Sequence, residues 1–273
     1  MTAPKRMRVV LVTVIMGAVA IALTGSSCAD RFILPPVPAP SEGDGSPRLE
    51  FPHEDGVIEV FHARSPGALS AEPRAFVLRF TGDANQAAKF TASRWRDWPV
   101  EAWVVNYPGY GGSAGPRTLR HLADAALAAY DAIRTAAGGR PIILEGFSLG
   151  TVPALYVAAN RPVAGLILQN PPALRQVILR NGWWNLWLLA GPVAWSVPDE
   201  LDSLANSKKC AAPAVFLIAE KDSTVPPDVQ RGVFAAYAGL KRLIVQPGAG
   251  HVEPLLEVTE NQLREGMEWI ISH

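Results

Sequence analysis

Short apolar runs alternate along the chain with segments that repeat apolar residues at helical spacing. The clearest helical segment, 117–137, places Leu119, Leu122, Ala126 and Tyr130 three or four residues apart. Strands that alternate with helices favour a parallel sheet that helices cover on both faces. The apolar runs, rich in β-branched and aliphatic residues, predict buried strands at 75–81, 100–106, 141–145, 163–169, 214–219 and 242–246.

Two further elements are expected at the ends of this series. Residues 50–62 alternate apolar and polar positions as a β-hairpin does, so they are expected to add antiparallel strands at one edge of the sheet. The last helix is expected over 255–272. These elements together predict one α/β domain.

The N-terminal segment has the pattern of an export signal. Lys5, Arg6 and Arg8 precede an uncharged run, 9–23, that is shorter than the roughly 20 residues of a membrane-spanning helix, and small residues follow it. Residues 1–29 are therefore predicted to be a signal peptide or a lipoprotein signal. An uncleaved membrane anchor is the alternative.

Cys28 directly follows small residues, which resembles a bacterial lipoprotein processing site where that cysteine becomes lipidated. The pattern departs from such sites at Gly25, where they usually carry Leu. A cut after Ala29 would serve a soluble exported protein equally well. The predicted localisation is therefore export from the cytoplasm, with the protein either anchored to a membrane, by lipid or by an uncleaved signal, or secreted or periplasmic.

A Pro-rich segment separates this signal from the rest of the chain. Residues 30–48 contain mostly Pro and small polar residues, a composition that favours an extended linker without a packed core. The folded domain is therefore predicted over 49–273, which is long enough for one sizeable core.

A serine lies on a predicted sharp turn between a strand and a helix. The apolar strand 141–145 leads into Gly146-Phe-Ser148-Leu-Gly150, and a helical stretch, 151–159, follows. A strand, a nucleophile elbow and a helix have this order, and the elbow requires small residues two before and two after the serine. Ser148 is therefore the candidate nucleophile.

A serine hydroxyl needs a base to accept its proton and a carboxylate to orient that base. In this arrangement both follow the serine along the chain. Asp222 comes after the strand at 214–219, and His251 comes after the next strand, so both are expected at the carboxyl edge of the sheet. Glu220 and Asp228 are the alternatives for the acid. The histidines that do not fit this order are His53, His62, His121 and His273.

Acyl transfer also needs hydrogen-bond donors for the oxyanion of the tetrahedral intermediate. The first expected donor is the backbone N–H of Leu149, directly after the serine. The second is expected in the loop after the first central strand, from the N–H of Asp83, with Ala84 as the alternative. Phe147 is expected either to line the acyl pocket or to pack beneath the turn.

These features together resemble the α/β-hydrolase superfamily: residues 146–150, Asp222, His251 and the loops 81–85 and 106–113. Within it, the chain is most similar to the serine-hydrolase branch of monoacylglycerol-lipase-like and serine-aminopeptidase-like proteins. The resemblance implies the α/β-hydrolase fold, a mostly parallel central sheet flanked by helices with a helical cap insertion. It also implies hydrolysis of carboxylic esters, thioesters or amides without a cofactor.

The resemblance covers about residues 50–272 and departs from the family pattern at two loops. The oxyanion loop usually begins His-Gly, whereas Thr81 precedes Gly82 here. The loop after the next strand often begins Asp-Tyr-Arg-Gly, whereas residues 106–109 read Asn-Tyr-Pro-Gly. Both departures leave the expected catalytic roles intact.

The cap is expected at about 171–205, where this fold usually carries its insertion. The segment contains Trp183, Trp184, Trp187 and Trp195. A lid of such residues would line an apolar acyl pocket and bind substrate, or it would rest on a membrane interface. Ordinary packing of the cap helices onto the sheet is the alternative.

The charge balance and the cysteine count limit the binding partners that are expected. Lys and Arg together number 25, as do Asp and Glu, so no net positive field favours nucleic acid. Two cysteines, Cys28 and Cys210, cannot build a zinc site from thiolates alone, and no metal or cofactor is expected. The expected partners are a small or lipid-like acyl substrate and a membrane that holds the N-terminus.

The predicted function is that of a serine hydrolase that cleaves carboxylic esters, with lipophilic acyl esters favoured by the apolar cap. Three alternatives remain at this point: a peptidase or amidase on the same residues, an acyltransferase, and a binding protein on the same fold that has no activity.

Overall fold

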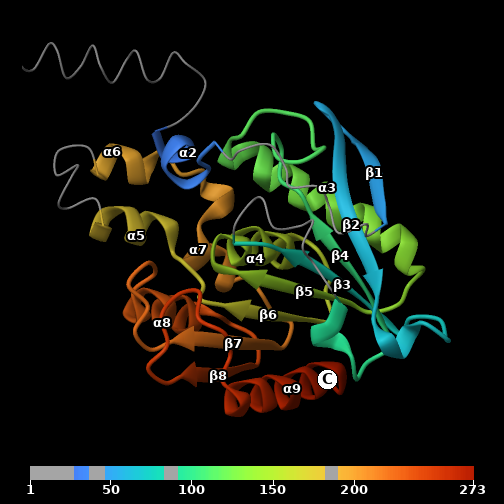
Figure 1. The fold of residues 1–273 in the computed structure, drawn as a ribbon. Helices are drawn as coiled ribbons and strands as arrows, with labels where there is room; N and C mark the ends of the chain where they lie inside the picture. Colours follow the sequence, from blue (N-terminus) through green and yellow to red (C-terminus); the bar gives the residue numbers. More distant parts are fainter. Residues whose placement is uncertain (1–27, 37–46, 83–91, 182–189) are drawn as a thin grey trace, which may run out of the picture.

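A mostly parallel eight-stranded sheet runs through the part of the chain that the computed structural model describes, residues 28–36, 47–82, 92–181 and 190–273. Its strand order is β1-β2-β4-β3-β5-β6-β7-β8 (Figure 1). β1 and β2 form an antiparallel hairpin, β2 pairs antiparallel with β4, and the remaining neighbours are parallel. The strands are β1 (Arg48–His53), β2 (Gly56–Arg64), β3 (Ala75–Phe80), β4 (Val100–Val105), β5 (Ile142–Phe147), β6 (Gly165–Gln169), β7 (Ala214–Ala219) and β8 (Lys241–Gln246).

The fold predicted from the apolar pattern is confirmed. Every predicted strand is present, and the alternating segment 50–62 forms the edge hairpin of β1 and β2. Strand β5 continues two residues beyond the predicted 141–145, so the sharp turn begins directly at Ser148. The structure is an α/β-hydrolase fold.

Helices cover both faces of the sheet. Leu155 of α4 and Val233 of α8 share one core with Leu78 of β3, whereas Met267 of α9 shares the other core with Val77 of β3. Successive residues of a strand face opposite sides, so β3 contributes to both cores. The helices are α2 (Cys28–Ile33), α3 (Leu119–Ala137), α4 (Thr151–Asn160), α5 (Leu174–Asn181), α6 (Ala190–Trp195), α7 (Ser203–Ser207), α8 (Pro227–Ala236) and α9 (Glu257–Ile271).

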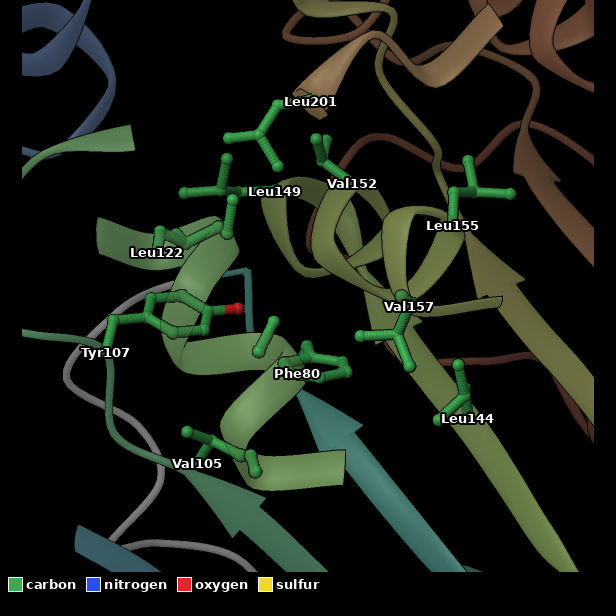
Figure 2. Close-up of a cluster of buried hydrophobic side chains, with 14 of the residues drawn as sticks. Phe80, Val105, Tyr107, Leu122, Leu144, Leu149, Val152, Leu155, Val157 and Leu201 are labelled. Atoms are coloured by element: carbon green, nitrogen blue, oxygen red, sulfur yellow. The ribbon is translucent and has the colours of Figure 1, made fainter. Parts of the chain in front are cut away.

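The core beneath α4 supports the turn that carries the serine (Figure 2). Val157 of α4 lies beside Leu144 of β5, the strand that leads into that turn. At the other end of α4, Leu149 and Val152 lie beside Leu201, which is fully buried. Leu201 ends the short 3-10 helix η5 (Asp199–Leu201). The segment between β6 and β7, where the cap is expected, therefore packs onto the start of α4.

The segment 28–36 differs from the linker expected over 30–48. Residues Cys28–Ile33 form helix α2, and Ala29, Asp30 and Leu34 are buried. Asp30 Oδ1 accepts a hydrogen bond of 2.7 Å from the backbone N–H of Leu119, at the start of α3. The first N–H groups of a helix lack partners within it, so this carboxylate gives the segment a fixed place in the fold.

The remaining N-terminal predictions lie outside this packed segment. Residues 1–27, which hold all but the last two residues of the predicted signal 1–29, lie outside the described residues, as do residues 37–46, which hold much of the predicted linker. Among the residues that the structure describes, none of the helices combines the length and apolarity needed to cross a bilayer.

Replacement of Asp30 by Ala should lower the melting temperature of the full chain by roughly 2 to 8 °C, because it leaves the buried N–H of Leu119 without its acceptor. Asp124→Ala is the matched control, since Asp124 is exposed on α3. Thermal unfolding followed by circular dichroism measures both. Equal melting temperatures for the two variants would show that Asp30 does not hold α2 in place.

Candidate active site

Ser148 occupies a strained position at the end of β5. Its φ is 49°, in the left-handed region that residues with side chains rarely adopt. The flanking glycines allow the turn. A Cβ on Gly146 would lie 2.6 Å from Thr151 Cα, and a Cβ on Gly150 would lie 2.0 Å from the carbonyl oxygen of Phe80. The nucleophile elbow predicted from the sequence is therefore present in its geometry.

The three residues predicted from their order along the chain meet at the carboxyl edge of the sheet. His251 Nε2 lies 2.8 Å from Ser148 Oγ, and His251 Nδ1 lies 2.6 Å from Asp222 Oδ2. The side chain of Asp222 is fully buried, and that of His251 is 13% exposed. With Nδ1–H donated to the carboxylate, Nε2 is the free acceptor for the serine proton.

Other groups hold the Asp222 carboxylate in its orientation. Its Oδ1 accepts hydrogen bonds from the backbone N–H groups of Thr224 and Val225, at 2.9 and 2.8 Å. Its Oδ2 accepts one of 2.9 Å from Nε2 of Gln230 on α8, besides the contact with His251. These donors fix both carboxylate oxygens in place. Gln230 has no signal in the sequence, because only the fold brings α8 beneath Asp222.

The alternative acids and three of the four other histidines have other partners. Glu220 accepts a hydrogen bond from the N–H of Gly248, and Asp228 pairs with Arg180. His121 contacts Thr118 and Asp55, away from the serine. His62 lies beside Glu101, and the ring of C-terminal His273 packs on Trp269. Asp222 and His251 are thus the acid and the histidine that the structure places with Ser148.

Asn170 is a site residue that sequence reasoning missed. It follows β6 directly, has a φ of 51° and is buried. Its Nδ2 donates to the carbonyl of His251 at 2.9 Å, and its Oδ1 accepts from the N–H of Ala219 at 3.0 Å. Asn170 therefore joins the His251 loop to the ends of β6 and β7. The available signal was an Asn directly after a strand, since Asn tolerates the left-handed conformation.

The predicted oxyanion donors are described only in part. The N–H of Leu149 follows Ser148 in the turn, as expected. Asp83 and Ala84, the candidates for the second donor, lie outside the described residues, so that donor stays a prediction. Gly82, just before them, packs closely against the serine, since a Cβ there would lie 2.9 Å from Ser148 Cβ.

Tyr107 fixes the strand end that leads into this loop. Its hydroxyl donates a 2.6 Å hydrogen bond to the carbonyl of Thr81, directly before Gly82. Burial raises the pKa of Tyr107, which keeps the hydroxyl protonated as a donor. Thr81 stands where the family usually has His, and its carbonyl is oriented here by a side chain from the neighbouring loop.

The second departure from the family pattern also has a structural explanation. Asn106 Nδ2 donates to Glu59 Oε2 at 2.5 Å, and the N–H of Gly112 donates to the same oxygen at 2.8 Å. Ser113 Oγ donates to the carbonyl of Asn106 and accepts from the N–H of Glu59. The loop 106–113 is thereby fixed to strand β2 through the buried carboxylate of Glu59.

The predicted substrate contacts are only partly described. The ring of Phe147 packs against that of His251, with 5.4 Å between the centroids, so it contacts the reacting groups directly. Trp183, Trp184 and Trp187 lie outside the described residues, and their role stays a prediction. Trp195 on α6 is 80% exposed, so this tryptophan is not packed in the core.

Metal ligands do not cluster within the described residues: no group of three His, Cys, Asp or Glu side chains could hold a metal ion there. Cys210 is buried with a free thiol, and burial raises the pKa of that thiol to about 12. The groups placed for chemistry at this edge are therefore the hydroxyl, the imidazole and the carboxylate.

Comparison with known proteins places this geometry in a family. An uncharacterized protein of Mycobacterium tuberculosis is 32% identical over 209 residues, which are 76% of this chain and 68% of that protein. The family described as the alpha/beta hydrolase fold matches residues 101–208. The chain belongs to the α/β-hydrolase superfamily.

Solved structures of α/β hydrolases share its architecture. The acetyl xylan esterase from Paenibacillus sp. R4 superimposes with a TM-score of 0.65 at 16% identity and covers 83% of each chain. The monoacylglycerol lipase of Paleococcus ferrophilus superimposes with a TM-score of 0.57 at 18% identity, over 78% of this chain and 99% of the lipase. At these identities the likeness concerns the fold.

Asn170→Ala should weaken the contact between His251 and Asp222 in this α/β hydrolase, because the His251 loop loses its hydrogen bond to β6. The proton shared by His251 Nδ1 and Asp222 should give a strongly downfield proton NMR signal in the unchanged chain, and this signal should broaden or vanish in the variant. Asn160→Ala, at the exposed end of α4, should keep it. A signal unchanged by Asn170→Ala would exclude this positioning role.

Proposed function

We propose that this α/β hydrolase cleaves carboxylic esters through an acyl-enzyme on Ser148. The observation that carries the proposal is the continuous hydrogen-bonded series from the buried Asp222 carboxylate through His251 to Ser148 Oγ. A strained turn exposes the hydroxyl at the edge of the sheet, and a histidine that cannot rotate freely is ready to accept its proton.

The chemistry follows from these contacts. As Ser148 Oγ attacks the ester carbonyl carbon, its proton passes to His251 Nε2, and Asp222 stabilises the imidazolium. The N–H of Leu149 donates to the oxyanion, together with the predicted second donor in the 83–84 loop. His251 then protonates the departing alcohol. A water molecule that loses a proton to His251 then attacks the acyl carbon. The bond from this carbon to Ser148 Oγ breaks, His251 returns the proton to Oγ, and the carboxylic acid leaves.

A lipophilic acyl group suits the surroundings of the serine. Phe147 presents an aromatic ring beside His251. Trp183, Trp184 and Trp187, in the sequence between β6 and β7, are proposed to line the same acyl pocket. An apolar lining of this kind binds an acyl chain through burial, at about 0.8 kcal/mol for each methylene group.

The proposed location is the outer side of a membrane that the chain crosses during export. The basic residues before the uncharged run 9–23 support export, and Cys28 is the proposed lipidation site. An uncleaved run would anchor the chain equally well. Mass spectrometry of the purified N-terminus separates the lipidated, the uncleaved and the cleaved soluble forms.

Hydrolysis of a series of p-nitrophenyl esters tests the proposed activity. Ser148→Ala should lower kcat/KM at least about 1000-fold, because it removes the nucleophile. Ser70→Ala is the control, since Ser70 is exposed and distant along the chain from the site. In the unchanged protein, kcat/KM should rise about tenfold or more from acetate to octanoate.

Two results would contradict the proposal in different parts. Equal hydrolysis by Ser148→Ala and Ser70→Ala would show that Ser148 is not the nucleophile. If kcat/KM does not depend on the length of the acyl chain and aminoacyl amides are cleaved efficiently, the substrate is peptide-like and not a lipophilic ester.

A further inference from the structure

The helix α2 is part of the fold and fixes where the N-terminal run leaves the molecule. Ala29 is fully buried, and Asp30 and Leu34 are nearly so. The N–H of Ala29 donates to Ser196 Oγ, just after α6, and Tyr110 OH donates to the carbonyl of Pro35. Both ends of this short segment are therefore held on the body of the protein.

Few residues separate the uncharged run 9–23 from this helix in the sequence. A peptide chain spans at most about 3.5 Å for each residue, so the connection from Leu23 to Cys28 can reach roughly 17 Å at most. A bilayer that receives the run therefore approaches the protein on the side where α2 lies. The linker expected over 30–48 would have removed this constraint, but residues 28–36 are held on the fold.

That side of the protein exposes large apolar side chains. Phe32 on α2 is 58% exposed, and Trp195 on the adjacent helix α6 is 80% exposed. Figure 1 shows α2 and α6 side by side, and the bond from Ala29 to Ser196 joins them. Single exposed apolar residues are common, but here two aromatic rings lie next to the exit of an apolar run. Tryptophan in particular favours the headgroup level of a bilayer.

A polar cavity lies beside these rings. It has a volume of about 470 Å³ between α2, the start of α3 and the segment that follows α6. Arg120, Arg175, Asp199 and Glu200 contribute both charge signs to its lining, and Trp195 borders it. A mixed lining of this kind accommodates phospholipid headgroups, which themselves carry both signs or a single negative charge.

We propose that the α2–α6 face, defined by Phe32 and Trp195, rests on a phospholipid bilayer. The inference builds on the proposed membrane tether and ester hydrolase. The cap segment and Ser148 lie at the same carboxyl edge of the sheet, where Val252, next to His251, is also exposed. The proposal includes delivery of a lipophilic ester from the bilayer to Ser148 at this edge.

Photo-crosslinking in the full chain tests this contact. The chain is reconstituted into vesicles of equimolar phosphatidylethanolamine and phosphatidylglycerol with tritiated acyl chains, and p-benzoylphenylalanine replaces one exposed residue at a time. Phe32 and Trp195 are the test positions. Leu69 and Leu240 are the controls, because they are 74% and 61% exposed and precede the amino ends of β3 and β8.

Lipid adducts should form about tenfold more at positions 32 and 195 than at 69 and 240. Equal adducts at all four positions, or none at 32 and 195, would overturn the proposal. Adducts from 32 and 195 to a second copy of the chain in place of lipid would also overturn it, and would assign the face to a dimer.

A pair of double variants tests the consequence for substrate access. Phe32→Ser/Trp195→Ser should lower kcat/KM about tenfold for a long-chain ester embedded in the vesicles, and should leave hydrolysis of dissolved p-nitrophenyl acetate unchanged. Leu69→Ser/Leu240→Ser should change neither rate. Equal rates of the two double variants on the embedded ester would overturn delivery from the bilayer.

The two parts of the account fail separately in these experiments. If the unchanged chain hydrolyses neither ester, the proposed function is wrong, and the lipid adducts still decide whether the α2–α6 face contacts the bilayer. If it hydrolyses both esters and the adducts are absent, the activity stands and the bilayer face is wrong.

Discussion

The hydrogen bond between Ser148 Oγ and His251 Nε2 exists only because the backbone at Ser148 adopts a conformation that chains usually avoid. Strain of this kind persists where the surroundings leave no alternative. Here Gly150 packs against the carbonyl of Phe80, and Gly146 packs against Thr151, so the strand, the turn and the helix fit in one arrangement. The buried core around α4 stabilises that arrangement.

The remaining parts of the site bring the imidazole to the serine. Asp222 receives hydrogen bonds from two backbone N–H groups and from Gln230, and in turn orients His251. Asn170 holds the backbone of His251 from the other side. The turns after β5, β6, β7 and β8 thus supply Ser148, Asn170, Asp222 and His251. A parallel sheet suits the arrangement, because the carboxyl ends of its strands lie at one edge.

Sequence reasoning found the residues whose roles follow from local pattern and chain order. Ser148 has glycines at fixed spacing, and Asp222 and His251 each follow a recognisable strand. Gln230, Asn170 and Tyr107 were missed, because their roles depend on side-chain contacts that appear only in the folded chain. Gln230 lies eight residues after Asp222, and Asn170 and Tyr107 contact segments far along the chain.

The helix α2 was missed for a different reason. Most of the segment 30–48 has the composition of a linker, and its first residues are held by contacts with distant segments, among them the hydrogen bond from the N–H of Leu119 to Asp30. The contact of α2 with α3 changes where the proposed tether joins the domain. The proposed tether would join the domain at α2, which packs beside α6, and not through a long Pro-rich linker.

The most direct test of the account is the reaction of the full chain with a fluorophosphonate, which labels serines that a neighbouring base activates. Peptide mass spectrometry locates the adduct in the unchanged chain and in His251→Ala. An adduct at Ser148 that His251→Ala abolishes is the predicted result. A folded chain that forms no adduct, or one whose labelling does not depend on His251, would contradict the central claim that these residues form an activated nucleophile.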